Sequence, residues 1–369
     1  MRIALVSPLF ESVPPKLYGG TERVVANLCD GLVKSGVEVS VFASADSEVS
    51  GELIPMVDQA LRLREPPVTD IGPHHMKILA EVAKRAEEFD VIHNHHDYWM
   101  FPLSKLTSTP VLTTLHGRLD LPDLKTVFDA YPEHSFVSIS DSQRTPQPQL
   151  RWVNTIYHGI DVNRFEYHPE PGEYLAFLGR ICREKRPEWA IEIAKKSGIP
   201  LKIAAKIEKG EGQEYYDTFV KPHVDGKFIE FVGEISESQK SDFLGKARAL
   251  VFPIDWPEPF GLVVIESLAC GTPVLARPVG SVPELIEDGV TGFLDLNIEQ
   301  LADRVLEISK ISRSACRAQA EKRFSLRRMT EDYLNVYRFL SEFKSRIGRS
   351  DRRRRDLVYP FECRPDRNS

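Results

Sequence analysis

Short apolar segments that alternate with amphipathic helical patterns limit the folds open to this chain. RIALVSP (2–8) and VEVSVFAS (37–44) are rich in the aliphatic and β-branched residues of buried strands. Between them, Thr21 is placed to cap a helix and Gly36 to end it, and apolar residues recur at helical spacing at Val24, Val25, Leu28, Leu32 and Val33. A strand, a helix and a second strand in this order form a right-handed unit with parallel strands.

The alternation continues in two blocks separated by a turn-rich stretch at 157–173. In the first block, strands are predicted at 90–95, 111–117 and 136–140, and helices near 74–88 and 142–149. In the second block, strands are predicted at 174–180, 201–206, 227–234, 249–254 and 273–277, and helices after Pro187, at 236–247, after Phe260, and at 297–309, 312–323 and 325–344. This order predicts two doubly wound α/β domains.

The length agrees with that count, because 369 residues correspond to about two domains of roughly 150 residues each. We place the first domain at 1–165, the second at 166–325, and a C-terminal helix at 326–345. The remaining segment, 346–369, carries eight arginines against four acidic residues. We expect it to be a disordered basic tail, and a contact with anionic lipid or RNA is the alternative interpretation.

Composition excludes several classes of function. The net charge of −6 provides no general attraction for nucleic acid. No apolar run approaches the roughly 20 residues of a membrane span, and the opening run from Ile3 to Phe10 is too short for a secretory signal. The five cysteines form no CxxC pair, so neither a disulfide framework nor a structural zinc site is indicated. We therefore expect a cytoplasmic protein.

The most informative motif is PEPFGLVVIE at 257–266, which follows an apolar strand and opens a helix. Free N–H groups of Phe260, Gly261 and Leu262 at that helix start are expected to form an anion site. Glu258 and Glu266 are about 10–12 Å apart along the helix axis, so they would hold separate parts of one long ligand. Two surface glutamates beside an amphipathic helix are the alternative.

A second motif, GRICREKRP at 179–187, also lies where a strand ends and a helix begins. Arg180 and Lys185 are suited there to binding phosphate, although a basic helix start on the surface is the alternative. No D-x-D triplet occurs, so we expect no metal and expect the protein's own cations to neutralise the phosphate.

Weaker signals follow three strands of the first domain. Gly19 and Gly20 permit a close backbone approach, and His116 ends a strand. The densest group of ligand-type side chains comprises His93, His95, His96 and Asp97, with Trp99 close by. Because neighbouring side chains on a strand end point to opposite faces, we favour a polar wall for a second substrate over a metal site.

In combination these motifs resemble the retaining glycosyltransferases of family 4 over about residues 1–345. The resemblance is carried by E-P-F-G-L-V-V-I-E, G-R-x4-K, Y-G-G-T-E, T-L-H-G, S-D-S-Q-R, H-G-I-D and the segment G-T-P-V-L-A-R-P-V-G-S-V-P-E-L-I-E-D-G-V-T-G-F-L. It implies a GT-B fold, with two Rossmann-like domains, a donor cleft between them, and a final helix that crosses back to the first domain.

The resemblance also implies residue roles. The second domain would bind the donor: Arg180, Lys185 and the N–H groups of residues 260–262 at the diphosphate, Glu266 at the ribose, and Glu258 at the transferred sugar. The first domain would bind the acceptor, with His116 near the reacting carbon and Gly19 and Gly20 beside the diphosphate. The nucleobase region is assigned to Lys206, Gly233 and Glu234, and the acceptor region to His93, His95, His96, Asp97 and Trp99.

The predicted function is metal-independent transfer of a hexosyl unit from a nucleotide sugar, such as a UDP- or GDP-sugar, by a front-face mechanism with retention. No cofactor is expected. The acceptor is a glycan, a lipid or a small molecule. The alternatives are a catalytically silent nucleotide-sugar-binding protein, and an epimerase or glycoside phosphorylase of the same architecture.

Overall fold

The computed structural model describes residues 1–347 and divides the chain into two units. Unit 1 comprises Met1–Gly159 together with the chain from Leu326, and unit 2 comprises Ile160–Ser325. The division at Gly159 falls inside the turn-rich stretch, six residues before the expected boundary at 165. Most of the basic tail predicted at 346–369 lies outside the described residues.

Unit 1 contains a seven-stranded parallel sheet with the order β3-β2-β1-β4-β5-β6-β7. Its strands are β1 (Arg2–Val6), β2 (Glu38–Ser44), β3 (Glu52–Val57), β4 (Val91–Asn94), β5 (Val111–Thr114), β6 (Ser135–Ser138) and β7 (Trp152–Thr155). Its helices are α1 (Gly20–Lys34), α2 (Gly72–Arg85), α3 (Leu103–Leu106), α4 (Leu124–Ala130), α5 (Asp141–Arg144) and α13 (Leu326–Ile347). The strand order reverses at β1 and β4, where doubly wound sheets bind ligands.

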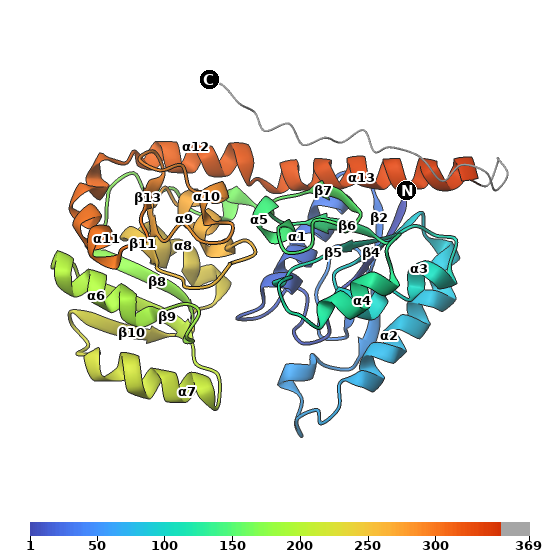
Figure 1. The fold of residues 1–369 in the computed structure, drawn as a ribbon, viewed down its shortest axis with the longest axis horizontal. Helices are drawn as coiled ribbons and strands as arrows, with labels where there is room; N and C mark the ends of the chain where they lie inside the picture. Colours follow the sequence, from blue (N-terminus) through green and yellow to red (C-terminus); the bar gives the residue numbers. More distant parts are fainter. Residues whose placement is uncertain (348–369) are drawn as a thin grey trace. The chain divides into compact units, whose positions relative to one another are not determined.

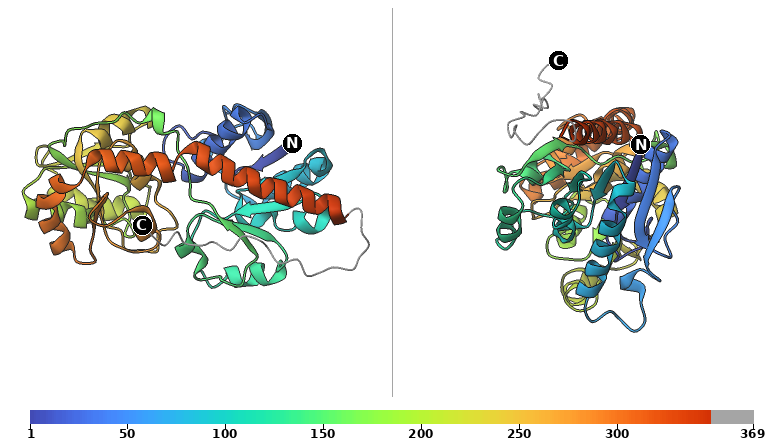
Figure 2. Two further views of the ribbon diagram at one scale, coloured as in Figure 1. Left: turned by 90° about the horizontal axis from the view of Figure 1, so that it is seen from above. Right: turned by 90° about the vertical axis from the view of Figure 1, so that its right-hand side faces the viewer.

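Helix α13 is an integral part of unit 1 (Figures 1 and 2). It packs against α1 at Gly31, where an added Cβ would lie 2.0 Å from Oγ1 of Thr330. The side chains of Tyr333 and Tyr337 are fully buried. Arg328 donates hydrogen bonds to the carbonyls of Tyr157 and His158, which ties the helix to the end of the unit's first segment. The expected C-terminal helix that returns to the first domain is therefore confirmed.

Unit 2 contains a six-stranded parallel sheet with the order β10-β9-β8-β11-β12-β13. Its strands are β8 (Tyr174–Arg180), β9 (Leu201–Lys206), β10 (Ile229–Gly233), β11 (Ala247–Phe252), β12 (Val274–Ala276) and β13 (Gly292–Leu294). Its helices are α6 (Pro187–Ser197), α7 (Glu211–Tyr215), α8 (Glu237–Gly245), α9 (Leu262–Ala269), α10 (Val282–Leu285), α11 (Ile298–Arg304) and α12 (Arg313–Arg323). The strand order reverses at β8 and β11. The two Rossmann-like domains are confirmed.

Three predicted helix boundaries were wrong. Helix α1 begins at Gly20 with Gly19 as its N-cap, so Thr21 does not cap it. Helix α9 begins at Leu262 and not at Phe260, because Gly261 has a φ of +100°, which no helical residue adopts. The helix expected at 142–149 ends as α5 at Arg144, because prolines at 146 and 148 prevent its continuation.

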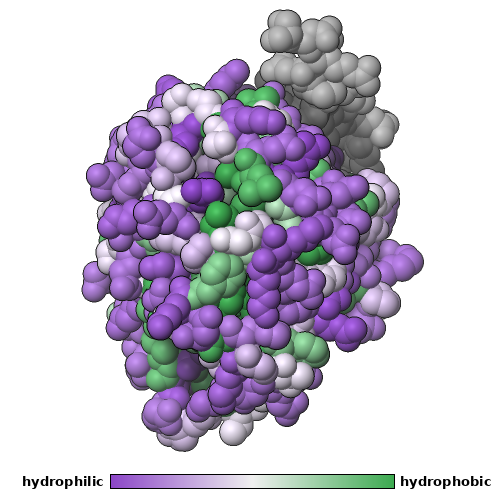
Figure 3. Space-filling view, turned by 90° about the vertical axis from the view of Figure 1, so that its left-hand side faces the viewer, coloured by the Kyte–Doolittle hydropathy of each residue, from purple (hydrophilic) through white to green (hydrophobic). Residues whose placement is uncertain are grey.

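The described surface is largely polar. The face in Figure 3 is mainly hydrophilic, with a narrow apolar strip near its middle. Exposed apolar side chains of unit 2 include Phe219, Val290, Leu296 and Leu306. Among residues 1–347, none of the helices combines the length and the apolar character needed to span a bilayer.

Candidate active site

The predicted donor residues of unit 2 gather at the carboxyl ends of two neighbouring strands, β8 and β11. Arg180 ends β8 and Lys185 follows it, whereas Glu258 lies in the loop between β11 and α9. The loops after these strands border the point where the strand order reverses. Ligands of doubly wound sheets bind at this position.

Lys185 and Glu258 form a partly buried ion pair, with Nζ of the lysine on Oε2 of the glutamate. Their side chains are only 12% and 11% exposed. The indole Nε1 of Trp256 donates a second hydrogen bond, 2.8 Å long, to the same oxygen. Nζ of Lys185 also lies 5.3 Å and 5.4 Å from the ring centroids of Phe252 and Trp256, within cation–π range. Glu258 is therefore not the surface carboxylate of the alternative interpretation.

Asp255 ties the two loops together. Its N–H donates to the carbonyl of Glu184 at 2.9 Å, and its carboxylate accepts from Nη2 of Arg186 at 2.7 Å and from Nη1 of Arg277 at 2.6 Å. The hydrogen bond from Arg186 is the main cause that lowers the pKa of Asp255. Lys185 is therefore flanked in the sequence by Glu184 and Arg186, which both form hydrogen bonds to Asp255 in the loop that carries Glu258.

Backbone strain occurs in the same loop. Arg186, the N-cap of α6, has φ +50° and ψ +53°, in the left-handed region that non-glycine residues rarely adopt. Among residues 1–347, Asp97 in unit 1 is the other non-glycine residue with a positive φ, at +47°. Strained residues of this kind cluster at functional sites.

The loop of Gly280 packs directly on Glu258. A Cβ at Gly280 would lie 2.4 Å from the backbone nitrogen and 2.5 Å from the carbonyl oxygen of Glu258. The N–H of Ser281 donates to that carbonyl oxygen at 3.0 Å. The backbone of Glu258 is thus held by a glycine contact and by a hydrogen bond.

Glu266 lies on α9, and its side chain is 2% exposed. Its Oε1 accepts from Nζ of Lys240 on α8 at 2.8 Å, and Lys240 also contacts Glu237 at 3.0 Å. The first turn of α9 contains Leu262 and is preceded by Phe260 and Gly261, where helix N–H groups have no partner within the helix. Along the sequence, the start of α9 therefore lies between the partly buried Glu258 and the buried Glu266.

The remaining predicted donor residues lie along the same edge of the sheet. Nη1 of Arg180 is 3.5 Å from a carboxylate oxygen of Glu208, so a bound phosphate would compete with that carboxylate. Lys206 ends β9, and Gly233, with a φ of +86°, ends β10 immediately before Glu234. The strands that carry these residues, β8, β9 and β10, lie successively farther from β11 in the strand order.

In unit 1, buried histidines occupy the carboxyl ends of β4 and β5. His93 contacts the hydroxyl of Tyr337 at 2.6 Å and Oγ1 of Thr114 at 2.8 Å. Nδ1 of His95 lies 2.8 Å from Nε2 of His116, and His96 contacts His75. Burial lowers the pKa of His116 to about 3 and that of His96 to about 3. These imidazoles are therefore neutral near pH 7.

The expected acceptor residues differ in accessibility. The side chains of His93, His95 and His96 are buried, whereas Asp97 is exposed and Trp99 is half-buried against the ring of His75. The side chains of His95 and His96 contact different partners, His116 and His75, as expected for neighbouring residues at a strand end. Within residues 1–342, no group of three or more histidine, cysteine, aspartate or glutamate side chains is arranged to hold a metal ion.

Gly19 and Gly20 lie where α1 begins. A Cβ at Gly19 would lie 2.7 Å from Cβ of Pro15, so the loop before the helix is closely packed. Glu22, in the first turn of α1, is buried, and this burial raises its pKa to about 7. Glu22 ends the Y-G-G-T-E motif, and the sequence alone indicates no role for it.

Three residues that contact the predicted site had not been anticipated: Trp256, Asp255 and Lys240. Asp255 and Trp256 directly precede the PEPFGLVVIE motif at 257–266, so the sequence already places them near Glu258. Lys240 approaches Glu266 from a different helix, 26 positions away, and no sequence pattern indicated that contact.

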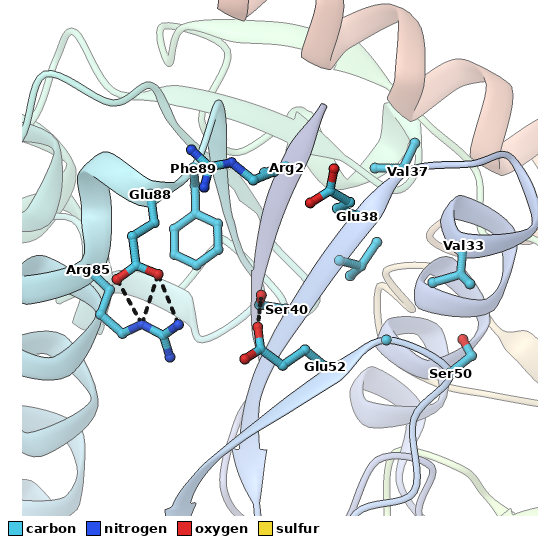
Figure 4. Close-up of a pocket in the computed structure, with 12 residues that line it drawn as sticks. Arg2, Val33, Val37, Glu38, Ser40, Ser50, Glu52, Arg85, Glu88 and Phe89 are labelled. Atoms are coloured by element: carbon cyan, nitrogen blue, oxygen red, sulfur yellow. Dashed lines mark hydrogen bonds and ion pairs between the residues drawn. The ribbon is translucent and has the colours of Figure 1, made fainter.

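A cavity of about 540 Å³ lies elsewhere in unit 1, at the amino ends of β1, β2 and β3 (Figure 4). Arg2, Glu38 and Glu52 begin these strands and line the cavity. Its charged groups are partly paired with each other, as Arg85 is with Glu88 at 2.9 Å. The cavity is at the opposite strand ends from the residues described above, so none of the predicted site residues lines it.

Comparison with known proteins agrees with the two-unit architecture. Residues 18–164 match the model "Glycosyltransferase Family 4", and residues 160–323 match "Glycosyl transferases group 1". Sucrose-phosphate synthase from Thermosynechococcus elongatus has a similar fold, with a TM-score of 0.77 at 20% identity over 93% of this chain and 100% of that chain. Anabaena HepE in complex with UDP and glucose gives a TM-score of 0.70 at 19% identity over 91% and 99%.

Sequence relatives support the same class. The D-inositol 3-phosphate glycosyltransferase of Mycolicibacterium smegmatis is 25% identical over 91% of this chain and 90% of its own length. The phosphatidyl-myo-inositol mannosyltransferase of the same organism is 28% identical over 80% of each. The two matching family models and these relatives identify the chain as a glycosyltransferase, and its two Rossmann-like domains are those of the GT-B fold. The chain belongs to the family 4-like glycosyltransferases, as the sequence motifs predicted.

Proposed function

We propose that this glycosyltransferase moves a hexosyl unit from a nucleoside-diphosphate sugar, such as a UDP- or GDP-sugar, to an acceptor hydroxyl. The observation that carries the proposal is the partly buried Lys185–Glu258 pair at the β8–β11 switch point of unit 2, beside the start of α9. A cation, helix N–H donors and a carboxylate at one strand edge match a ligand that carries both phosphate and sugar hydroxyls.

Each part of such a donor has a suitable group in unit 2. Arg180, Lys185 and the first N–H groups of α9 supply positive charge and dipoles for the diphosphate. Glu266 offers a buried carboxylate for the ribose hydroxyls, and Glu258 offers one for the transferred sugar. HepE, a structural neighbour, has been solved with UDP-glucose, which supports a nucleotide-sugar donor of this size.

We propose a metal-independent, front-face reaction with retention and no cofactor. Fixed cations and helix N–H groups stabilise negative charge on the departing diphosphate, and this preorganised stabilisation is a large contribution to catalysis. The leaving phosphate oxygen accepts the proton of the acceptor hydroxyl, so no carboxylate nucleophile is required. His116 stays neutral, because burial lowers its pKa to about 3, and its predicted role at the reacting carbon is that of a hydrogen-bonding group.

The acceptor is proposed as a hydroxyl of a glycan, a lipid or a small molecule. The names of the two mycobacterial relatives contain D-inositol 3-phosphate and phosphatidyl-myo-inositol. Free inositol, inositol phosphate and phosphatidylinositol therefore belong in the first acceptor panel. Simple sugars and glycans form the second.

The experiment measures binding of UDP, GDP and ADP, and of their hexose conjugates, by calorimetry in EDTA, followed by transfer assays on the acceptor panel. Before calorimetry, thermal shifts identify the base, because a ligand at 100 times its Kd stabilises the fold by about 2.7 kcal/mol. Arg180→Ala with Lys185→Ala should remove binding. Lys196→Ala is the matched control, because Lys196 forms an exposed pair with Glu299 and Asp303.

Binding of one nucleotide without metal, its loss in the double variant and retention of anomeric configuration in the product together support the proposal. Binding that requires a divalent metal contradicts the metal-independent mechanism. Tight nucleotide-sugar binding without transfer to any acceptor favours the catalytically silent alternative.

A further inference from the structure

Trp256 makes a contact that the donor-site motif does not predict. Its indole Nε1 donates to Oε2 of Glu258 at 2.8 Å, the same oxygen that pairs with Lys185. Within the described part of the chain, both hydrogen bonds to this carboxylate end on Oε2. Oε1 accepts no hydrogen bond from the side chains of this part of the chain.

We propose that Trp256 is a positioning residue that determines which sugar Glu258 accepts. Two donors on one carboxylate oxygen fix the rotation of the carboxylate plane, so Oε1 is presented in one direction. A hydroxyl that forms a hydrogen bond to Oε1 must then lie in that direction. Sites with fixed polar groups discriminate strongly against a substrate whose matching hydroxyl is missing or displaced.

The indole ring has a second contact with the same pair. Nζ of Lys185 lies over the ring of Trp256 at 5.4 Å and over the ring of Phe252 at 5.3 Å from the centroids. The negative faces of both rings attract the ammonium group and keep it next to Glu258. Trp256 thus holds the carboxylate directly through its N–H and holds the partner lysine through its ring.

The backbone of Trp256 is itself anchored. The N–H of Glu258 donates to the carbonyl of Trp256 at 2.8 Å, and the preceding residue, Asp255, is held by Arg186, Arg277 and Glu184. The loop therefore fixes where the indole side chain begins, and the hydrogen bond from Nε1 to Glu258 fixes its orientation.

This inference rests on the proposed function, because it assigns Glu258 to the transferred sugar. A positioning role for Trp256 also predicts a result that a merely structural role for this residue does not predict. Loss of the indole N–H should affect the sugar and leave the nucleotide alone, since Arg180, the α9 N–H groups and Glu266 remain unchanged.

The test compares Trp256→Phe with the wild type in kcat, KM and discrimination between two donors that share a base and differ in one sugar hydroxyl. Phenylalanine keeps an aromatic ring beside Lys185 and removes the N–H. We expect kcat/KM for the preferred donor to fall about tenfold, in line with loss of one hydrogen bond to a charged group. Discrimination between the donors should fall similarly, and the Kd of the bare nucleoside diphosphate should change less than twofold.

Trp152→Phe is the matched control, because the indole N–H of Trp152 donates to the carbonyl of Gln147 at 2.9 Å in unit 1. That variant should lose stability without losing donor discrimination. If Trp256→Phe does not fold, Trp256→Leu replaces it, because leucine also lacks a side-chain hydrogen-bond donor. Unchanged discrimination overturns the inference, and so does an equal loss of affinity for the bare nucleoside diphosphate.

Failure of the proposed function gives a different result. Wild-type protein that transfers no sugar from any donor contradicts that function, whatever the variants do. The ratio of the Kd of the nucleotide sugar to the Kd of the bare nucleotide then tests the positioning role by itself. If the wild type binds the two ligands with equal Kd, both the proposed function and the role of Trp256 are wrong.

Discussion

Nδ1 of His95 lies 2.8 Å from Nε2 of His116, so the two imidazoles share one proton in a hydrogen bond. Nε2 of His95 is buried and has no hydrogen-bond partner among the described residues. An unpaired lone pair there costs less than an unpaired N–H, which places the shared proton on Nδ1 of His95. His116 then carries its own proton on Nδ1.

We predict that His116 remains a neutral Nδ1–H tautomer throughout the physiological range. Burial lowers its pKa to about 3, so it should stay uncharged down to about pH 5. Imidazole ¹⁵N chemical shifts measured between pH 5 and 8 check this, and His116→Ala assigns the signals. A titration of His116 with a midpoint above pH 6 contradicts the prediction.

Breaking the Lys185–Glu258 pair should destabilise the fold as well as the site. Lys185→Met leaves a carboxylate that is only 11% exposed without its counter-charge, which should cost about 3 kcal/mol of unfolding free energy. Lys196→Met, which breaks an exposed pair, should cost less than about 0.5 kcal/mol. Urea unfolding of both variants measures the difference. Equal losses of unfolding free energy in the two variants would show that solvent screens the Lys185–Glu258 pair.

Gly280→Ala should disturb Glu258 through the backbone. The new Cβ would overlap the nitrogen and oxygen of Glu258, and φ at Gly280 is +59°, so we expect a loss of about 3 kcal/mol and reduced transfer activity. Gly289→Ala isolates the conformational cost, because Gly289 has a φ of +75° with open space around it. That control should lose about 1 kcal/mol and keep its activity. Thermal unfolding and donor kinetics distinguish the two variants.

The burial of Glu22 should make stability depend on pH between about 4.5 and 7. Its pKa is raised from 4.5 to about 7, mainly by desolvation, so the folded state binds the proton more tightly than the unfolded state. The contribution of protonated Glu22 to the free energy of unfolding is complete below pH 4.5. It is lost as the pH rises through 7, and the loss amounts to at most about 3 kcal/mol.

Glu22→Gln removes this ionisation. The unfolding free energy of the variant relative to the wild type should therefore rise between pH 5 and pH 8. Chemical denaturation at the two pH values measures it. A constant difference between the two proteins shows that Glu22 ionises in the folded state as readily as in the unfolded chain.

The sequence predicted most strands, and the missed ones share a physical cause. β3, β7 and β13 are all edge strands, which pair on one side only. Edge strands need fewer apolar residues: β3 contains Pro55, β7 contains Asn154 and Thr155, and β13 is only three residues long. The central strands are buried on both faces, so their apolar runs identified them.

The candidate site was predictable only in part. Parallel strands end at one edge, so the motifs after β8 and β11 could be placed near each other from their order alone. The partners of the carboxylates could not, because Lys240 on α8 and the Trp256 indole reach them through side-chain packing. Sequence spacing contains no information on which oxygen of Glu258 is occupied.

The return of α13 to unit 1 has a consequence for synthesis on the ribosome. Unit 2 is one continuous segment, Ile160–Ser325, and can fold as soon as it has emerged. Unit 1 begins first but finishes last, because Tyr333 and Tyr337 complete its interior beside His93 and Thr114. The histidine-bearing edge of the nascent unit 1 therefore stays incomplete until α13 has left the exit tunnel, after unit 2 has already formed.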